Sequence, residues 1–112
     1  MFDGQPQLVE FYETLEGSRP VQEWLEILDS RTDTRITARI ERLQLGNPGD
    51  YKSVGSGVYE MRIDFGPGYR VYFALSGISI VLLLCGGSKK TQQADIETAY
   101  EYWSEYKKRN KL

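Results

Sequence analysis

Two alternating runs of residues, separated by a Gly-Pro-Gly segment, constrain the fold of this chain more than any other feature. The runs are VYEMRID, beginning at residue 58, and YRVYF, beginning at residue 69. Successive side chains of a strand point to opposite faces, so one face would carry the aromatic and aliphatic side chains and the other the charged ones. Two such runs around glycine and proline predict an antiparallel hairpin with one core-forming face.

The opposite face of this hairpin is predicted to carry several charged side chains. Counting outward from the loop places Asp64 across from Arg70 and Arg62 across from Tyr72, within reach of each other on adjacent strands. Glu60 lies on the same face, two residues before Arg62. We therefore expect two arginines and a tyrosine to converge on a polar surface.

A third strand should follow the hairpin. The apolar run ISIVLLL covers residues 78–84, whereas a membrane span takes roughly 20 apolar residues. The run leads to Gly86 and Gly87, which permit close backbone approach, and then to Lys89 and Lys90. A site is expected at this end of the sheet, although the two glycines also fit a tight turn into the next helix.

The rest of the chain predicts an N-terminal edge strand and three helices. Ser18 or Arg19 would cap the first helix, with Pro20 tolerated in its first turn. In chain order, the expected elements are a strand at 7–12, a helix from 18–20, a break at 29–33, a second helix ending at 46–49, a loop around Lys52, the three strands, and a helix after Thr91. This order predicts a single α+β domain over residues 1–112, with a small antiparallel or mixed sheet, a helical hairpin and a C-terminal helix.

Composition narrows the classes of function. The chain has no histidine, and Cys85 is its single cysteine, so a zinc site and every histidine-dependent triad lack their usual side chains. Cys85 itself is expected to be a small core side chain. The N-terminus has neither the basic start nor the apolar segment of a secretory signal, and a cytoplasmic location is therefore expected.

Charge is segregated along the chain. Residues 1–29 hold seven acidic residues and one basic residue, whereas residues 30–92 hold nine basic residues and five acidic ones. The middle of the chain is thus locally basic. The overall pI near 5.2 argues against indiscriminate binding of nucleic acid, so an RNA target would need something else to help hold it.

Two long segments carry a resemblance to a known family. They are LQLGNPGDYKSVGSGVYEMRIDFGPGYRVYF and VLLLCGGSKKTQQADI, within a similarity that runs from about Val9 to about Glu101. In these segments the chain resembles the RelE/ParE superfamily of toxins from type II toxin–antitoxin modules, and most closely its HigB-like addiction module killer branch. The resemblance implies a RelE-like fold and a ribosome-dependent mRNA endonuclease that inhibits translation and is held inactive by a helix-turn-helix antitoxin.

The implied reaction requires few functional groups from the protein. The ribose 2′-OH attacks the adjacent phosphorus, so the protein must orient the RNA backbone, stabilise charge on the phosphoryl oxygens and assist proton transfer. No metal ion or other cofactor is expected. The predicted partners are accordingly the ribosome, its mRNA and the antitoxin, and no membrane.

Four cations are the predicted catalytic residues. Arg62 and Arg70 are assigned to the phosphate and to transition-state charge, because arginine forks match phosphate oxygens. Lys89 is assigned to the leaving oxygen, with Lys90 beside it. No general base is obvious, and Lys90 and Glu60 are candidates. The predicted RNA-binding residues are Lys52, Tyr72, Gln92, Arg39 and Arg42, with Tyr72 stacking on a base.

Arg39 and Arg42 belong to a longer basic stripe on the second helix. The stripe at helical spacing consists of Arg31, Arg35, Arg39 and Arg42. It is either solvated surface or a contact for ribosomal RNA phosphates or for an acidic antitoxin segment. Tyr102 and Tyr106 lie one turn apart outside the core pattern of the last helix, and are candidates for facing a partner.

Other interpretations stay open. As an ordinary surface, the polar face would pair Arg70 with Asp64 and Arg62 with Glu60. Two other functions also remain, a ParE-type gyrase inhibitor and a degenerate non-catalytic toxin that acts as an interaction subunit. The arginines and the lysine pair favour the nuclease, whereas the acidic pI and Glu60 leave the degenerate toxin open.

Overall fold

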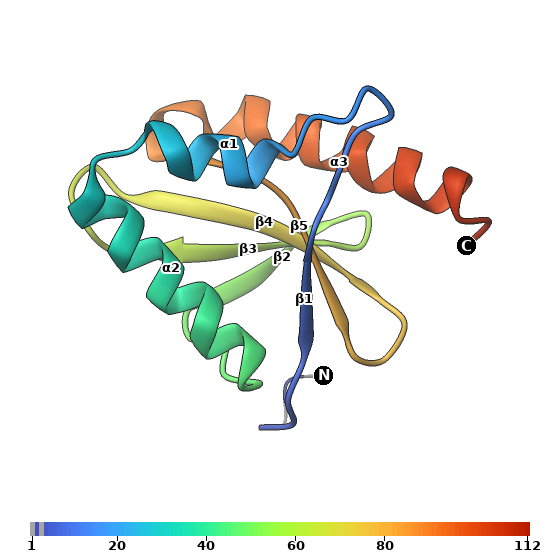
Figure 1. Cartoon of the computed structure of the whole chain (residues 1–112), viewed down its shortest axis with the longest axis horizontal. Coiled ribbons are helices and arrows are strands. Elements are labelled where there is room, and N and C mark those ends of the chain that lie inside the picture. Colours follow the sequence, from blue (N-terminus) through green and yellow to red (C-terminus); the bar gives the residue numbers. More distant parts are fainter. Residues whose placement is uncertain (1, 3) are drawn as a thin grey trace.

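In the computed structural model, which describes residue 2 and residues 4–112, five strands form one mixed sheet in the order β1-β5-β4-β3-β2 (Figure 1). β1 runs parallel to β5, and the other neighbouring pairs are antiparallel. The strands are β1 (Leu8–Phe11), β2 (Tyr51–Gly55), β3 (Val58–Ile63), β4 (Tyr69–Ser76) and β5 (Ile80–Ser88). The predicted α+β class with an N-terminal edge strand is confirmed.

The first and third helices start at the predicted positions, directly after Arg19 and Thr91. The helices are α1 (Pro20–Ile27), α2 (Ser30–Gln44) and α3 (Gln92–Arg109), the last preceded by a 3-10 turn at Lys89–Thr91. The Glu23 carboxylate accepts a hydrogen bond from the backbone N–H of Arg19, ahead of α1. Asp29 caps α2 by accepting from the N–H of Thr32, so α2 begins at once and the predicted break at 29–33 is too long. Within the described residues, no helix is both long enough and apolar enough to cross a membrane.

Two predicted strand boundaries are wrong. Lys52 lies in β2 instead of a loop, because Tyr51 packs against a core while the side chain of Lys52 stays exposed. β5 continues to Ser88 instead of ending at residue 84. Gly86 and Gly87 remain paired with β4, so they form neither a loop nor a turn.

The two faces of the sheet build two separate cores. α1 and α2 cover the first core, which contains the predicted inward residues Met61, Ile63, Val71 and Phe73. α3 covers the second core through Ala99 and Trp103. From the sheet, the second core takes Val58, Tyr72, Ala74, Leu82, Leu84 and Cys85. The hairpin face that was predicted to be polar is therefore buried over most of its length and open only near the β3–β4 loop.

The register of the hairpin differs from the predicted register by two residues. Arg62 pairs with Arg70, and Glu60 pairs with Tyr72. The loop is wider than predicted because it contains its own turns, in which the N–H of Phe65 donates to the Ile63 carbonyl and the N–H of Gly68 donates to that of Phe65. The two arginines thus face each other directly.

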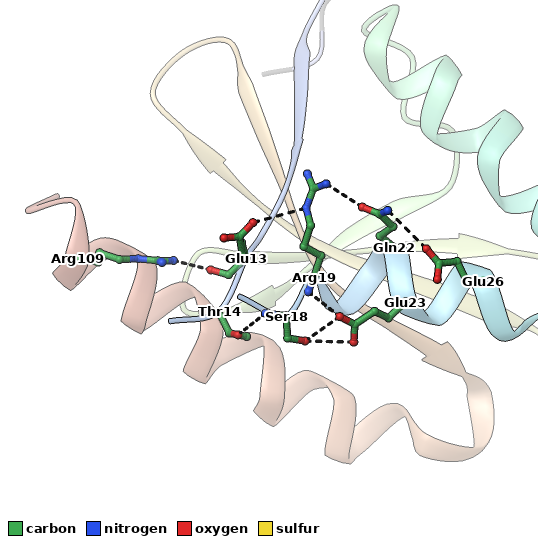
Figure 2. A network of polar contacts seen from close by, with 8 residues as sticks. All are labelled: Glu13, Thr14, Ser18, Arg19, Gln22, Glu23, Glu26 and Arg109. Atoms are coloured by element: carbon green, nitrogen blue, oxygen red, sulfur yellow. Dashed lines mark hydrogen bonds and ion pairs between the residues drawn. The ribbon is translucent and has the colours of Figure 1, made fainter. Parts of the chain in front are cut away.

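A polar network ties the connection between β1 and α1 to the end of α3 (Figure 2). Arg109 Nη2 donates to the carbonyl oxygen of Glu13 at 2.7 Å, and Arg19 Nε lies 3.9 Å from Glu13 Oε1. The Ser18 hydroxyl donates to the Glu23 carboxylate at 3.1 Å. Segments far apart in sequence are thereby fixed to each other at the edge of the sheet.

Tyr102 and Tyr106 pack within the chain. Tyr102 stacks on Tyr12 with ring centroids 4.7 Å apart, and Tyr106 stacks on Trp103 at 5.8 Å. Both tyrosines border the second core. Both side chains are nevertheless half-exposed, so the expectation that they face a partner stays a prediction.

Candidate functional site

Three of the four predicted catalytic residues line one hollow of about 370 Å³. It lies where β3 ends, β4 begins and β5 ends, beside the β3–β4 loop. The lining residues are Asp50, Arg62, Ile63, Asp64, Gly66, Pro67, Gly68, Tyr69, Arg70 and Lys89. We call this hollow the cationic hollow. Lys90, the fourth predicted residue, is exposed beside Lys89 but is not part of the lining.

Arg62 and Arg70 lie directly opposite each other on adjacent strands. Like charges in this arrangement are destabilising unless something offsets them. Each arginine has its own carboxylate, since Arg62 Nη2 lies 3.0 Å from Asp50 Oδ1 and Arg70 Nε lies 3.4 Å from Glu60 Oε2. The pairings of Arg70 with Asp64 and of Arg62 with Glu60, considered from sequence, are therefore wrong.

The two arginine pairs differ in exposure. The side chains of Arg62 and Asp50 are 42% and 58% exposed, so solvent screens their attraction. The hydrogen bond and the charge of Asp50 raise the pKa of Arg62. By contrast, the side chain of Arg70 is 11% exposed and that of Glu60 is fully buried. Removing one partner of the second pair would leave a buried charge uncompensated.

Glu60 is held from three sides. Besides Arg70, its Oε2 atom accepts a hydrogen bond from Gln92 Nε2 at 2.8 Å and one from the Tyr72 hydroxyl at 3.3 Å. Glu60 Oε1 makes no hydrogen bond within the described chain. Because the carboxylate is buried behind Arg70 and does not line the cationic hollow, Glu60 cannot act as a general base on a substrate bound there.

Tyr72 cannot stack on an RNA base. It is fully buried in the second core, and burial together with the neighbouring Glu60 carboxylate raises its pKa. Gln92 is also engaged, since its amide binds Glu60. The prediction for Tyr72 is wrong because α3 covers this face of the sheet, which the local alternation of a strand does not show. Gln92 is half-exposed, and its contact with RNA stays a prediction.

Lys89 is placed beside the β3–β4 loop by the backbone. Its N–H donates to the carbonyl oxygen of Gly68 at 2.9 Å, and its side chain is exposed. This hydrogen bond joins the end of β5 to the loop between β3 and β4. Lys89 therefore lines the same hollow as the two arginines, although it is distant from them in sequence.

Only part of the basic stripe on α2 is free. Arg39 Nη1 donates to the carbonyl oxygen of Arg62 at 2.6 Å, and Arg39 Nη2 donates to that of Pro48 at 2.8 Å. Burial lowers the pKa of Arg39. Its guanidinium thus joins α2 to the end of β3, and its predicted contact with RNA stays a prediction. Arg31, Arg35 and Arg42 are exposed, and Arg35 lies over the ring of Phe65 in the β3–β4 loop.

Lys52 and Cys85 complete the predicted residues. Lys52 is exposed in edge strand β2, opposite Glu60 in register but outside the lining of the cationic hollow. Cys85 is buried, and desolvation raises the pKa of its thiol to about 12. Its expected place in the core is confirmed, and the neutral thiol is a poor nucleophile.

The glycines of β5 make room for side chains of this chain. A Cβ atom at Gly86 would overlap the ring of Trp24 from α1, and one at Gly87 would overlap the Asp95 carboxylate at the start of α3. We predicted a close approach at these positions but assigned it to a ligand. The close approach is instead how α1 and α3 pack on the two faces of β5.

Replacing Gly86 with alanine is expected to destabilise the fold by about 1–3 kcal/mol, the usual cost of overpacking a core. Urea unfolding would measure the loss as a lower midpoint with an unchanged slope. Trp24→Leu and the double variant supply the control. Because the smaller leucine relieves the overlap, the combined loss should be less than the sum of the single losses, and simple additivity would contradict this packing.

Two carboxylates in the cationic hollow were not predicted as site residues. Asp50 comes from the segment before β2 and reaches Arg62, and its backbone oxygen also accepts from the Arg62 N–H at 2.9 Å. The missed strand β2 explains this omission. Asp64 was assigned only to pairing with Arg70, yet it is exposed at the rim and makes no hydrogen bond or ion pair among the described residues.

A larger hollow of about 790 Å³ lies between Leu15 and the second half of α3. Its lining includes Tyr100, Glu101 and Lys108 but none of the predicted catalytic or RNA-binding residues. Size alone does not identify a site for an anionic substrate. The cationic hollow is the better candidate because two arginines and a lysine converge there.

Comparison with known proteins gives a family match and a relative. A family model described as "Phage derived protein Gp49-like (DUF891)" matches residues 23–103. This range contains every residue that lines the cationic hollow. An uncharacterized protein of Haemophilus influenzae is 53% identical over 77 residues, which cover 68% of this chain and 78% of that protein.

Proposed function

We propose that this chain, which belongs to the Gp49-like (DUF891) family of phage-derived proteins, is a type II toxin that cuts mRNA on the ribosome. The family is associated with toxin–antitoxin modules. A toxin of such a module has an antitoxin partner. The finer proposal concerns the activity, which is the cleavage of a codon by attack of the ribose 2′-OH on the adjacent phosphorus.

The observation that carries this proposal is the gathering of Arg62, Arg70 and Lys89 in the cationic hollow. Charge develops on the phosphoryl oxygens as the 2′-OH attacks, and preorganised cations stabilise that charge most where solvent is limited. Arg70 meets this condition, because its side chain is 11% exposed and its backbone on β4 is paired with strands on both sides. Arg62 on the facing strand would hold a second phosphoryl oxygen.

Lys89 and Asp64 supply the proton-transfer groups in this proposal. Lys89 is exposed at the rim and would protonate or stabilise the leaving 5′ oxygen. Removal of the 2′-OH proton needs a carboxylate or amine that reaches the substrate. Asp50 is already held by Arg62, whereas Asp64 is exposed at the hollow without an ion pair among the described residues, so we assign this step to Asp64.

The ribosome would supply what this acidic chain lacks. The chain has a net charge of −2, and the cationic hollow is small for an extended RNA. Binding an extended RNA through its phosphates alone would need many exposed cations. Outside the cationic hollow, the exposed cations of the central part of the chain are Arg31, Arg35, Arg42, Lys52 and Lys90. These five residues are the proposed contacts to ribosomal RNA, whereas the codon is presented to the cationic hollow in the decoding site.

Induced expression without the antitoxin is expected to stop growth and to produce cuts inside translated reading frames. Mapping of mRNA 5′ ends before and shortly after induction would measure this effect. The cuts should follow the reading frame, because the ribosome presents codons in register. Purified protein should cut free RNA at least about 100-fold more slowly than ribosome-bound RNA, since alignment by the ribosome is lost.

Two results would redirect the proposal. Efficient cutting of untranslated RNA would contradict the dependence on ribosomes. Intact mRNA together with DNA breaks that depend on gyrase would favour a ParE-type inhibitor instead. Growth arrest by a Lys89→Ala variant, with the same mRNA ends as the wild type, would remove Lys89 from the chemistry.

A further inference from the structure

The carboxylate of Glu60 is a buried charged group that the proposed chemistry does not use. It is 0% exposed, and its Oε2 atom meets three different side chains, Arg70 and Tyr72 from β4 and Gln92 from α3. Burying a carboxylate is costly unless cations and hydrogen-bond donors compensate it. A group retained at that cost, directly behind a candidate active site, calls for a role beyond filling space.

The geometry around Arg70 divides its guanidinium into two edges. The Nε edge faces Glu60 at 3.4 Å, an ion pair that is not aligned as a hydrogen bond. The other edge carries Nη1, which lies near Gly68 in the lining of the cationic hollow. A guanidinium held from behind in this manner presents its free edge to a phosphate with little loss of side-chain entropy.

Glu60 also reaches the lysine side of the cationic hollow. Its Oε2 atom accepts from Gln92 Nε2 at 2.8 Å, and Gln92 is the residue that directly follows the 3-10 turn Lys89–Thr91. The N–H of Lys89 is fixed at the same time to the carbonyl oxygen of Gly68. One buried carboxylate therefore fixes Arg70 directly and the segment that carries Lys89 through Gln92.

We infer that Glu60 is a positioning residue that aims Arg70, and through Gln92 the Lys89 segment, at a phosphate bound in the cationic hollow. The inference rests on the proposed function. Glu60 acts on the substrate only through these side chains, because it does not line the cationic hollow. Its loss should consequently lower the rate of cleavage and leave the affinity for the ribosome, which distant contacts provide, unchanged.

Glu60→Gln is the sharpest variant, because it removes the charge and keeps the shape. The single-turnover rate at saturating ribosomes is expected to fall about 10- to 100-fold, since small misplacements of a reacting group cost up to this much. The half-saturating concentration of ribosomes should stay within about twofold. The NMR signal of Arg70 Nε–Hε should also shift and exchange with solvent at least about 10-fold faster, whereas the Nε–Hε signal of Arg39, whose Nη1 and Nη2 atoms donate to carbonyl oxygens away from Glu60, should not change.

A matched control separates positioning from general destabilisation. Val58 is fully buried in the second core, on the same strand and face as Glu60, and its side chain carries no charge and no hydrogen-bonding group. Val58→Ala should lower the melting temperature while leaving the cleavage rate of the folded protein and the Arg70 signal as in the wild type. Gln92→Ala, a half-buried position, supplies a second test if Glu60→Gln fails to fold, with an expected rate loss of about 3- to 10-fold.

The outcomes separate the positioning role of Glu60 from the proposed cleavage of mRNA. A folded Glu60→Gln protein with the rate of the wild type, or with an unchanged Arg70 signal, would overturn the positioning role. An equal loss of rate in Val58→Ala would do the same. If the wild type does not cut mRNA on the ribosome, the proposed function fails, and the Arg70 signal still decides whether Glu60 sets the orientation of that side chain.

Discussion

Replacing Arg70 with alanine is expected to lower the rate of mRNA cleavage about 100- to 1,000-fold, the usual cost of one lost transition-state contact. The same change should destabilise the fold, because the fully buried Glu60 would lose its cation. Removing one partner of a buried ion pair costs roughly 3–5 kcal/mol, which lowers the melting temperature of a chain this size by on the order of 10 °C. Single-turnover kinetics and a thermal melt on the same preparation would measure both effects.

Lys89→Ala is the matched control for this prediction. Lys89 lines the same cationic hollow, but its side chain is exposed and pairs with no carboxylate among the described residues. We expect it to lose rate without losing stability. Arg70→Lys should recover part of the stability but little of the rate, because a lysine cannot present a fork to the phosphate while it faces Glu60. An Arg70→Ala protein that melts like the wild type would show that Glu60 does not need this cation.

These expectations depend on a feature that the sequence alone misplaced. Strand alternation correctly separated Met61 and Val71 from Arg62 and Arg70, because the direction of side chains along a strand is a local property. The pairing of one strand with another depends on the width of the loop, which Phe65 and Gly68 set through turns that no simple count anticipates. The error of two residues kept each side chain on its correct face and changed only its neighbours.

The sequence also did not predict which face of the sheet the third helix covers. Sequence periodicity predicted the third helix but could not say that it covers the face that carries Glu60 and Tyr72. Once α3 lies there, Tyr72 is buried and the Gln92 amide donates to Glu60. The end of the sheet that lies beside the β3–β4 loop was predicted with more success, since Arg62, Arg70 and Lys89 do converge there. Long-range contacts, such as Asp50 with Arg62 and Trp24 with Gly86, have no local signal in the chain.

Substituting 2′-deoxyribose at the cut position of a ribosome-bound mRNA is expected to slow cleavage by at least about 1,000-fold. The reason lies in the donor set of the cationic hollow. Its carboxylates are Asp50, which is engaged by Arg62, and Asp64, so the hollow favours holding a phosphate by cations over holding paired divalent ions. The attacking oxygen then comes from the substrate itself, whose 2′-OH sits beside the phosphorus at a high effective concentration.

The position of the substitution supplies the control. A 2′-deoxyribose one nucleotide downstream leaves the attacking hydroxyl in place and should be cut at nearly the normal rate, whereas 2′-O-methyl ribose at the cut position should block the reaction as the deoxy substrate does. The upstream fragment should end in a 2′,3′-cyclic phosphate or 3′-phosphate, and the downstream fragment in a 5′-hydroxyl. Recovery of 5′-phosphate and 3′-hydroxyl ends would mean that water attacked the phosphorus. The roles assigned to Arg70, Lys89 and Asp64 would then have to be withdrawn, because each was derived for an attack by the neighbouring ribose.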